Sequence, residues 1–512
     1  MNRVLLLLTL ATVAVAHGQG PGLLEVRVFG GAGEESCRAV WADDAGVLVA
    51  GETTSPVFLQ TGNGGALGPV GRKGFVMALD TGLVHQWSFA FPGDPAASVD
   101  APSSMVLRDV VRDPGDSAVA WVLYDAPRDG VWEGHLLGVH ATEGKVAEFD
   151  LTAPGAAFSA ALTPAGGNTF LVVGHTASTS APSVPTGIQV GLWSGSVDAP
   201  PGWALLADTE GMEALDADWH ADTLYIAVRR ANVPSAPHAI LAVTVDNGNP
   251  VVSDVAAIED PDIELHRLTA SGEGLAWAGT LSSADGTLDA VFGRLAAVPE
   301  PLETVEWGQE WVVETGSAAD RPARDVLWTG DVVQCAARTT TKGEGGAGAL
   351  VQTRFGPTGA WFGAYTFGGA ADEDVWDLAL DPQGRLLVAG SSNSWTELTA
   401  GNGSQDATLF RSSRTNFTLG FDSVQVAVAV PTESVFVGVE ARWPVQQDAT
   451  GWWVRAGASW PERLGTSWTL HAPDGRQVVA GQGQQVPHVQ GLHWLRREDI
   501  LGARAIPVWV EE

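Results

Sequence analysis

Basic residues are scarce in this sequence of 512 residues. Lys and Arg together number 28, against 60 Asp and Glu, so the formal net charge is −32. Acidic residues occur at an ordinary frequency, and the charge therefore reflects missing bases. Nucleic-acid binding needs clustered Lys and Arg to displace counterions, so this composition argues against a nucleic-acid partner. Anionic membrane surfaces are disfavoured for the same reason.

Cysteine is scarcer still, because Cys37 and Cys335 are the only two. They lie far apart in the sequence, in segments that we assign to different structural units. Two cysteines give neither a disulfide framework nor the spacing of a zinc site. Export would permit a disulfide, but we expect two buried free thiols.

Motifs of catalysis and cofactor binding are also missing. The sequence has no Gly-x-Ser-x-Gly elbow, no phosphate-binding or dinucleotide glycine pattern and no Asp-x-Asp-x-Asp-Gly calcium loop. Histidines are scattered, and only His135 and His140 lie close together. The sequence therefore predicts no catalytic residue, no metal site and no cofactor.

Long apolar runs are confined to the N-terminus. Asn2 and Arg3 precede a run from Val4 to Val15, and residues 14–16 read Ala-Val-Ala. This pattern predicts a signal peptide over residues 1–16, cleaved after Ala16, with a buried helix as the alternative. No later run is long enough to span a bilayer. We therefore expect a secreted protein in the periplasm, at the cell surface or in the medium, not membrane-spanning.

What the sequence does contain is a repeat. The segment Phe29–Ser55 and the segment Phe367–Ser394 share a Phe-Gly-Gly-Ala start, acidic residues, an Asp-x-x-Gly turn and an apolar strand that ends in Gly. Asp hydrogen-bonds the backbone ahead of it and Gly accepts positive φ, so the shared turn connects two strands.

Weaker copies fill the interval, at intervals of about 50 to 70 residues. Central buried strands are expected at Val47–Gly51, Val119–Leu123, Phe170–Gly174, Leu224–Val228, Leu275–Gly279, Val332–Ala336 and Leu386–Gly390. Each is followed by a further strand. Seven copies of this length predict an all-β fold, with a seven-bladed β-propeller over residues 22–413. A parallel β-helix has shorter turns, and a string of sandwiches needs longer units.

The N-terminal segment offers a way to close the ring. Leu24–Phe29 is similar to Trp87–Phe91, which we expect to be the outer strand of the first copy. The last copy ends near Arg411, one strand short. We therefore predict that Leu24–Phe29 completes the last blade and removes an exposed sheet edge.

At these residues the sequence resembles the bacterial seven-bladed β-propeller repeat family. The resemblance is carried by Gly30-Gly31, Asp43–Gly46 and Val47–Gly51, and again by Gly368-Gly369 and Leu386–Gly390. It is clear in the first and last copies and weaker in the middle five. It implies the fold and an extracytoplasmic setting. It implies no activity, because the family has no common catalytic residues.

The tail, residues 416–512, also has the pattern of β-structure. Its seven tryptophans are Trp443, Trp452, Trp453, Trp460, Trp468, Trp494 and Trp509. We expect a small sandwich-like β domain, with an eighth blade as the alternative. Tryptophans could stack on sugar rings and make this domain a carbohydrate-binding module, or they could fill a small core.

Acidic residues occupy equivalent positions in the first and last copies. The candidate binding residues are Glu34, Glu35, Asp372, Glu373 and Asp374. We expect them on the same face of neighbouring blades, where they could hold a cation, repel anions or serve as solvated turn residues.

A partial echo of the sialidase turn occurs at 283–287, where Ser283, Asp285, Gly286 and Thr287 are present but the Trp is missing. The leading hypothesis is nonetheless a non-catalytic binding or scaffold protein, whose partner is a protein or polysaccharide of the cell envelope. The alternative is a secreted polysaccharide-active enzyme, which needs paired carboxylates in a pocket at the channel mouth.

Overall fold

We describe the fold from a computed structural model. It describes residues 24–415 except 31–32, 56–71, 92–104, 129–130, 152–156, 166–168, 179–180, 231–237, 247–248, 259, 273, 284–285, 297–310, 318–321, 331, 341–346, 356–360, 368–370 and 395–404. Beyond residue 415 it describes 424–425, 428–429, 452–455, 467–471, 477–482, 491–497 and 506–511. The predicted signal peptide therefore lies outside the described residues. The described part of the chain has no helix that could cross a lipid bilayer.

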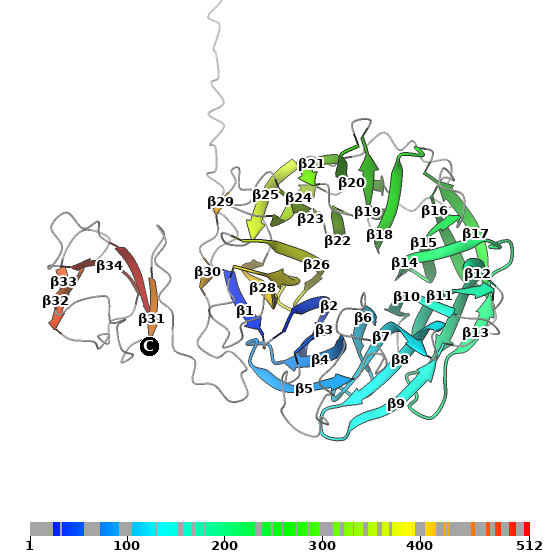
Figure 1. Cartoon of the computed structure of the whole chain (residues 1–512), viewed down its shortest axis with the longest axis horizontal. Coiled ribbons are helices and arrows are strands. Elements are labelled where there is room, and N and C mark those ends of the chain that lie inside the picture. Colours follow the sequence, from blue (N-terminus) through cyan, green and yellow to red (C-terminus); the bar gives the residue numbers. More distant parts are fainter. Residues whose placement is uncertain are drawn as a thin grey trace, which may run out of the picture.

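Seven sheets stand around a common axis, and each is an antiparallel meander that starts at the axis (Figure 1). Blade 1 holds β2 (Glu35–Asp43), β3 (Gly46–Thr53), β4 (Lys73–Leu79) and β5 (His85–Phe91). Blade 2 holds β6 (Val106–Arg112), β7 (Val119–Arg128), β8 (Val131–His140) and β9 (Gly144–Asp150), and blade 3 holds β10 (Ala157–Pro164), β11 (Phe170–Ser178), β12 (Ala181–Trp193) and β13 (Gly202–Leu205).

The remaining blades repeat the plan. Blade 4 holds β14 (Met212–His220), β15 (Thr223–Arg230), β16 (Ala239–Asp246) and β17 (Asn249–Ala257), and blade 5 holds β18 (Ile263–Ser271), β19 (Gly274–Ser282), β20 (Leu288–Ala296) and β21 (Trp311–Ser317). Blade 6 holds β22 (Ala323–Thr329), β23 (Val332–Thr339), β24 (Gly348–Phe355) and β25 (Trp361–Phe367). Blade 7 holds β26 (Glu373–Leu380), β27 (Arg385–Ser392), β28 (Asp406–Thr415) and β1 (Leu24–Phe29).

This architecture confirms the predicted all-β, seven-bladed propeller. All seven predicted central strands lie within the second strand of a blade. The predicted turn chemistry is also present. The Asp43 carboxylate accepts the backbone N–H of Ala45 at 3.0 Å, and that of Asp381 accepts the N–H of Gln383 at 3.0 Å. Gly384, which ends the second of these turns, has a φ of 71°.

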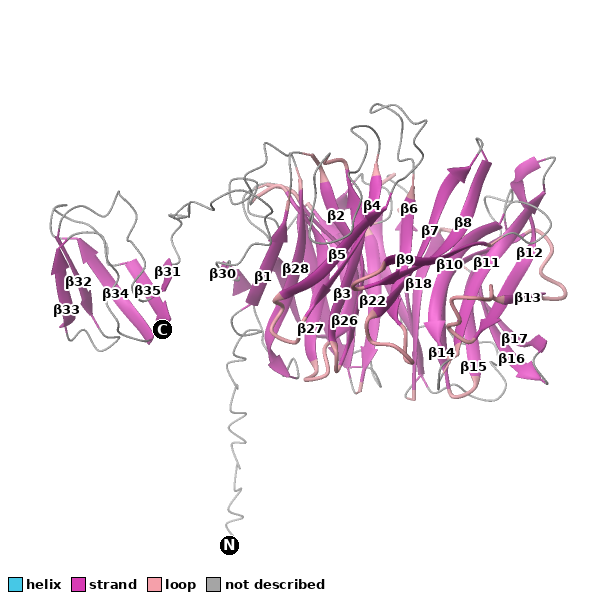
Figure 2. Cartoon of the chain, turned by 90° about the horizontal axis from the view of Figure 1, so that it is seen from below, coloured by secondary structure: helices cyan, strands magenta, loops and turns pink. Residues whose placement is uncertain are grey.

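The ring is closed by the N-terminal strand, as predicted. β1 pairs antiparallel with β28 from Leu24–Ser412 to Phe29–Ala407. Val26, Val28 and Phe29 are buried, so this strand belongs to the packed core and is not a loose terminus. Figure 2 shows β1 standing beside β28 at the side of the ring.

Apolar side chains fill the spaces between blades. Seven clusters of buried residues are present in the described chain, and each combines residues of two neighbouring blades. Cys37 and Cys335 are buried in two different clusters and neither forms a disulfide. Burial raises the pKa of the Cys335 thiol to about 12. Both cysteines are therefore core residues, as expected from the sequence.

Two short strands of the tail return to the propeller. β29 (Val424–Gln425) pairs parallel with β25 of blade 6, and β30 (Val428–Ala429) pairs parallel with β1 of blade 7. Two edge pairings with the propeller thus lie within the segment 416–512, which the sequence analysis assigned to a small β domain.

The rest of the described tail forms one five-stranded sheet. Its order is β31 (Trp452–Arg455), β35 (Ile506–Glu511), β34 (Gly491–Arg497), β32 (Ser467–His471) and β33 (Gln477–Gln482). β31 and β35 run parallel, unlike any pair of adjacent strands in the four-strand meanders of the ring. This order argues against an eighth blade, and the sandwich stays a prediction.

Candidate functional site

Every innermost strand of the propeller carries one β-bulge, at the same place in each blade. The register shifts between residues 37 and 39, 107 and 109, 159 and 161, 214 and 216, 265 and 267, 323 and 325, and 375 and 377. A bulge leaves one residue unpaired and redirects its side chain. The seven bulge residues are Arg38, Arg108, Ala160, Leu215, His266, Arg324 and Trp376.

Glycine in the repeat motif makes room for the bulge. Gly51 faces Cys37, and a Cβ at Gly51 would lie only 2.1 Å from the carbonyl oxygen of Ser36. Gly390 faces Val375 in blade 7, and a Cβ at Gly390 would lie only 2.0 Å from the carbonyl oxygen of Asp374. The glycine that ends the repeated apolar strand therefore allows the bulge that redirects a neighbouring side chain.

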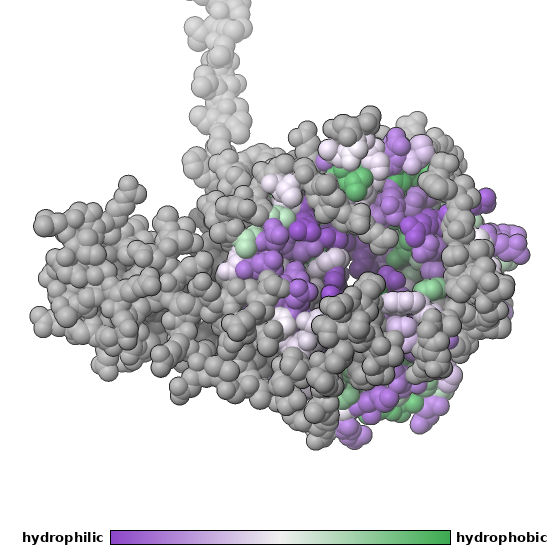
Figure 3. All heavy atoms as spheres, viewed as in Figure 1, coloured by the Kyte–Doolittle hydropathy of each residue, from purple (hydrophilic) through white to green (hydrophobic). Residues whose placement is uncertain are grey.

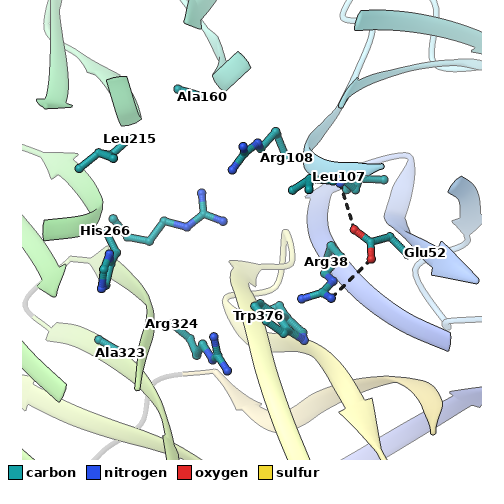
Figure 4. A pocket seen from close by; sticks show the side chains of 12 residues that line it. Arg38, Glu52, Leu107, Arg108, Ala160, Leu215, His266, Ala323, Arg324 and Trp376 are labelled. Atoms are coloured by element: carbon teal, nitrogen blue, oxygen red, sulfur yellow. Dashed lines mark hydrogen bonds and ion pairs between the residues drawn. The ribbon is translucent and has the colours of Figure 1, made fainter. Parts of the chain in front are cut away.

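The bulge residues line a single pocket of about 220 Å³ (Figure 4). Because residues of all seven innermost strands surround it, the pocket lies on the propeller axis. The remaining lining residues are Glu52, Val106, Leu107, Arg267 and Ala323. Figure 3 shows hydrophilic residues gathered around the hollow at the centre of the ring. Four arginines thus meet in one place, in a chain that has few basic residues.

Two of these arginines are held by carboxylates in a fixed orientation. Arg324 donates from Nε at 3.0 Å and from Nη2 at 2.7 Å to Asp374. Arg108 likewise contacts Asp125 from Nε at 2.9 Å and from Nη2 at 2.8 Å. A two-pronged carboxylate contact fixes the guanidinium plane. In the described structure these carboxylate contacts use the Nε and Nη2 groups of both arginines and leave their Nη1 groups outside the ion pairs.

Trp376 separates two guanidinium groups. The Cζ atom of Arg38 lies 3.6 Å from the Trp376 ring centroid, and that of Arg324 lies 4.1 Å away. Figure 4 shows the two arginines on opposite sides of the indole. Cation–π contacts of this kind hold both groups against the ring. The ring faces are thereby occupied, so Trp376 acts as a spacer between cations and is not a free stacking platform.

Glu52 is the one carboxylate among the described residues that line the pocket, and it is fully engaged. Its Oε2 pairs with Arg72 at 2.9 Å and with Arg38 at 3.5 Å. Its Oε1 accepts the backbone N–H of Leu107 at 3.2 Å, across the interface between blades 1 and 2. Glu52 therefore holds the rim together and positions Arg38.

A second layer of charge lies directly after the bulges. The residue that follows the bulge is an aspartate in blades 2, 4, 6 and 7, namely Asp109, Asp216, Asp325 and Asp377. We call these four the stapling aspartates. Each accepts the backbone N–H of the next blade's innermost strand, at distances of 2.7 to 3.0 Å; the donors are Leu162, Leu268, Leu378 and Val40. In blades 1, 3 and 5 the same position holds Ala39, Ala161 and Arg267.

Arg267 lies near the axis, among the stapling aspartates. Its Nη1 is 3.4 Å from Asp216, and its charge also interacts with the other three. Burial alone would lower the pKa of Arg267, but these carboxylates raise it above its ordinary value. Because they belong to four blades around the ring, the charge of Arg267 interacts with most of the ring while its side chain also lines the pocket.

The stapling aspartates themselves are hard to ionise. Burial, aided by the charge of Asp377, raises the pKa of Asp109 to about 7. Burial also raises the pKa of Asp325 to about 6. Asp377 has a pKa raised well above its usual range by burial and by the neighbouring Asp325 carboxylate. Asp325 and Asp377 hydrogen-bond to each other, and Asp377 keeps the proton.

The acidic candidates from the sequence start neighbouring innermost strands, but Glu35 and Glu373 are bound within their own blades. Glu35 accepts the hydroxyls of Thr53 and Ser55. Glu373 in the same way accepts those of Ser392 and Ser394. Both glutamates are buried. The repeated Glu and Thr/Ser residues therefore join the start of the first strand of a blade to the end of its second strand by hydrogen bonds between side chains.

The other three candidates have different surroundings. Asp374 is buried and supports the pocket through Arg324. Asp372 is exposed and accepts the backbone N–H of Ala347 at 2.7 Å. Glu34 is also exposed, and its carboxylate lies 4.0 Å from the guanidinium group of Arg72. Of the five, only Asp374 acts directly on a residue of the pocket.

Other residues that the sequence singled out lie apart from the pocket. Ser283 and Gly286 belong to the turn between β19 and β20, closed by a hydrogen bond of 2.9 Å, whereas Asp285 lies outside the described residues. His135 is buried against Tyr124 and pairs with Asp150 at 3.0 Å. His140 receives backbone N–H groups of its own turn. Over the described ranges, no group of three or more His, Cys, Asp or Glu is placed to hold a metal ion.

No family model matches this chain, and no curated protein matches it. Solved structures with a similar arrangement include a prolyl endopeptidase, at 13% identity over 94% of this chain and 54% of that chain, with a TM-score of 0.39. The endosialidase of phage phi92 has 9% identity over 92% of this chain and 81% of that chain, with a TM-score of 0.42.

The β-propeller domain of the Trilobed protease from Pyrococcus furiosus has 9% identity over 70% of this chain and 91% of that chain, with a TM-score of 0.36. This chain spans about half the length of the prolyl endopeptidase that it matches. Such distant likeness carries no activity to this chain. The propeller implied by the family resemblance is confirmed, and membership of the bacterial repeat family stays a prediction.

Proposed function

We propose that this chain is a non-catalytic, extracytoplasmic binding protein, whose propeller binds a carboxylate group of a cell-envelope partner in the axial pocket. The observation that carries the proposal is the meeting of Arg38, Arg108, Arg267 and Arg324 at one end of the bulged strands. Charge-assisted hydrogen bonds from guanidinium groups are the strongest that a carboxylate can form with side chains.

The pocket is organised before any ligand arrives. The carboxylates of Asp125 and Asp374 each fix a guanidinium, and Trp376 fixes the spacing of two of them. Ordering these long side chains beforehand lowers the entropic cost of binding. A rigid set of donors supports a binding role.

The lining supports binding over hydrolysis. A glycosidase of the usual kind needs two carboxyl groups about 5 to 10 Å apart beside the substrate. Among the described residues of this pocket Glu52 is the single carboxylate, and arginines and a backbone N–H already engage it. The polysaccharide-active alternative therefore has less support than the binding role.

The test compares propanoate with its neutral isostere propanamide, by NMR titration of the full chain at low ionic strength. We expect propanoate to bind and propanamide not to bind. Arg108→Gln should weaken propanoate binding at least about tenfold, because one charge-assisted hydrogen bond contributes on the order of 1.5 to 3 kcal/mol. Arg108 is the best choice because Asp125 keeps the N–H and hydroxyl of Ser159 as partners.

The matched control is Arg230→Gln, since Arg230 is exposed at the end of β15 and does not line the pocket. It should leave propanoate binding unchanged. Equal binding of propanoate and propanamide, or an equal loss in both variants, would contradict the proposal.

A further inference from the structure

The pocket is chemically two-sided, and this asymmetry follows from the order of the blades. His266, Arg324, Trp376, Arg38 and Arg108 come from blades 5, 6, 7, 1 and 2, which are consecutive around the ring. The two remaining blades, 3 and 4, contribute Ala160 and Leu215. In Figure 4 Leu215 and Ala160 lie on the far side of the space from Arg38 and Trp376. Among the bulge residues, the arginines therefore lie on one side and the aliphatic side chains on the other, and Val106, Leu107 and Ala323 add apolar surface on the side of the arginines.

The aliphatic side chains stand on the same kind of bulge as the arginines. Ala160 and Leu215 are the unpaired residues of β10 and β14, so the backbone aims them as it aims Arg38 and Arg108. Ala160 is buried at 3% exposure, whereas Leu215 is half-buried and packs at its edge against the core between blades 4 and 5. An exposed apolar surface that faces donors in a concave site favours a ligand with both kinds of group.

Size limits the ligand to a small group. The volume of about 220 Å³ equals roughly seven waters at ~30 Å³ each. It is below the range of about 300 to 1,000 Å³ typical of sites for drug-sized molecules. Both faces of Trp376 are occupied by guanidinium groups. A flat sugar ring therefore has no free indole face to stack on, and the apolar contacts come from aliphatic side chains, of which Leu215 and Ala160 lie opposite Arg38.

We infer that the ligand of this pocket is a small organic carboxylate that carries a short aliphatic group, with the carboxylate against the arginines and the aliphatic group against Leu215 and Ala160. This inference rests on the proposed function and names its ligand class. It distinguishes such acids from inorganic anions, which would gain nothing from the aliphatic side chains.

The experiment titrates the full chain with acetate, propanoate, butanoate, sulfate and phosphate, and follows binding by NMR. We expect affinity to rise about fourfold for each added methylene, the ratio that corresponds to ~0.8 kcal/mol per buried CH₂. Sulfate and phosphate carry no aliphatic group, so they report binding to the arginines alone. Leu215→Asn should abolish the rise with chain length.

Two further variants separate the possible failures. Leu215→Ala keeps an apolar residue and should reduce the rise without abolishing it, which covers the case in which Leu215→Asn fails to fold. Arg108→Gln should weaken all the carboxylates equally and keep the rise. Carboxylate binding with no dependence on chain length, or with a dependence that survives Leu215→Asn, overturns this inference and leaves the proposed function standing. No binding of any carboxylate overturns both.

Discussion

Single residues of this protein act mainly by tying one blade to the next. The stapling aspartates are an example, because each accepts a backbone N–H from the neighbouring blade while it lies in a site that disfavours its charge. Such a residue contributes a specific contact, and it also lowers the free energy of unfolding at the pH values where its carboxyl is ionised. The two effects can be separated by removing the charge and keeping the acceptor oxygen.

Asp109→Asn removes the charge and keeps one of the two carboxylate oxygens, which accept the backbone N–H groups of Leu162 and Val110. A carboxyl with a folded pKa of about 7, against an ordinary value of 3.8, contributes stability below pH 3.8 that is lost as the pH rises through 7. The lost acceptor lowers the stability of the variant at every pH, whereas the missing charge raises it only at high pH. We therefore expect the stability of the variant relative to the wild type to rise from pH 4 to pH 8, by at most about 4 kcal/mol. Denaturant unfolding at a series of pH values measures the difference.

The matched control is Asp44→Asn, which removes one charge from an exposed turn residue. A rise of similar size in this control would mean that the effect is not specific to the buried site of Asp109. A relative stability of Asp109→Asn that does not rise with pH would show that the charge of Asp109 is needed, for instance to hold Arg267.

The sequence predicted the roles of residues in turns better than those in the site. Asp43, Asp381 and Gly384 were assigned from local rules, and local rules govern turns. Arg38, Arg108 and Arg324 were missed because a pocket on the axis joins residues that are far apart in sequence. A usable signal was nonetheless present. A triplet of one variable residue, Asp and an apolar residue recurs ahead of the central strand at 108–110, 215–217, 324–326 and 376–378.

Among the elements, β1 is the one that closes the ring. Its six residues complete blade 7 and place Val26 and Val28 in the core between blades 6 and 7. The sequence predicted this element correctly, because the repeat was one strand short and the N-terminal segment matched the missing strand. It did not predict β29 and β30, whose two-residue pairings are too short to leave a periodic pattern.

Val26→Asp tests the importance of β1. Val26 is fully buried, so the new carboxylate would be desolvated without a partner. We expect a loss of about 4 kcal/mol or more in the free energy of unfolding, measured by chemical denaturation. Val255→Asp is the matched control, because Val255 lies on an outer strand of blade 4 and is 49% exposed. That change should cost no more than about 0.5 kcal/mol. Similar losses in the two variants would mean that β1 is not part of the cooperative core.

The described residues of the molecule form two β-rich parts. The repeat ends near residue 413, and the short strands Val424–Gln425 and Val428–Ala429 also pair with the outer strands of blades 6 and 7. Fragments for functional work should therefore be cut after residue 430. The Trp-rich sheet begins at Trp452.

A pull-down with fragments 17–430 and 431–512 tests which part holds the protein to its surroundings. We expect fragment 17–430 to sediment with cell envelope, because the proposed function places the envelope partner in the pocket of this fragment. Sedimentation of fragment 431–512 alone would place the attachment in the tail and contradict that proposal. The intact chain serves as the positive control, and circular dichroism checks that each fragment is folded. If neither fragment nor the intact chain sediments, docking to the envelope is wrong and a soluble ligand becomes the better hypothesis.

The arrangement of the stapling aspartates also reflects the odd number of blades in the ring. Blades 2, 4 and 6 each supply a stapling aspartate, which accepts a backbone N–H of blades 3, 5 and 7 respectively. From blade 2 to blade 7, interfaces with this hydrogen bond therefore alternate with interfaces that lack a stapling aspartate. Seven is odd, and strict alternation cannot return to its starting point. Blade 7 takes part in two such contacts. The backbone N–H of its Leu378 donates to Asp325 of blade 6, and its Asp377 accepts the backbone N–H of Val40 in blade 1. Asp325 and Asp377 then lie side by side and hydrogen-bond to each other, with the proton on Asp377. A ring with an even number of blades could alternate strictly and would not require this pair.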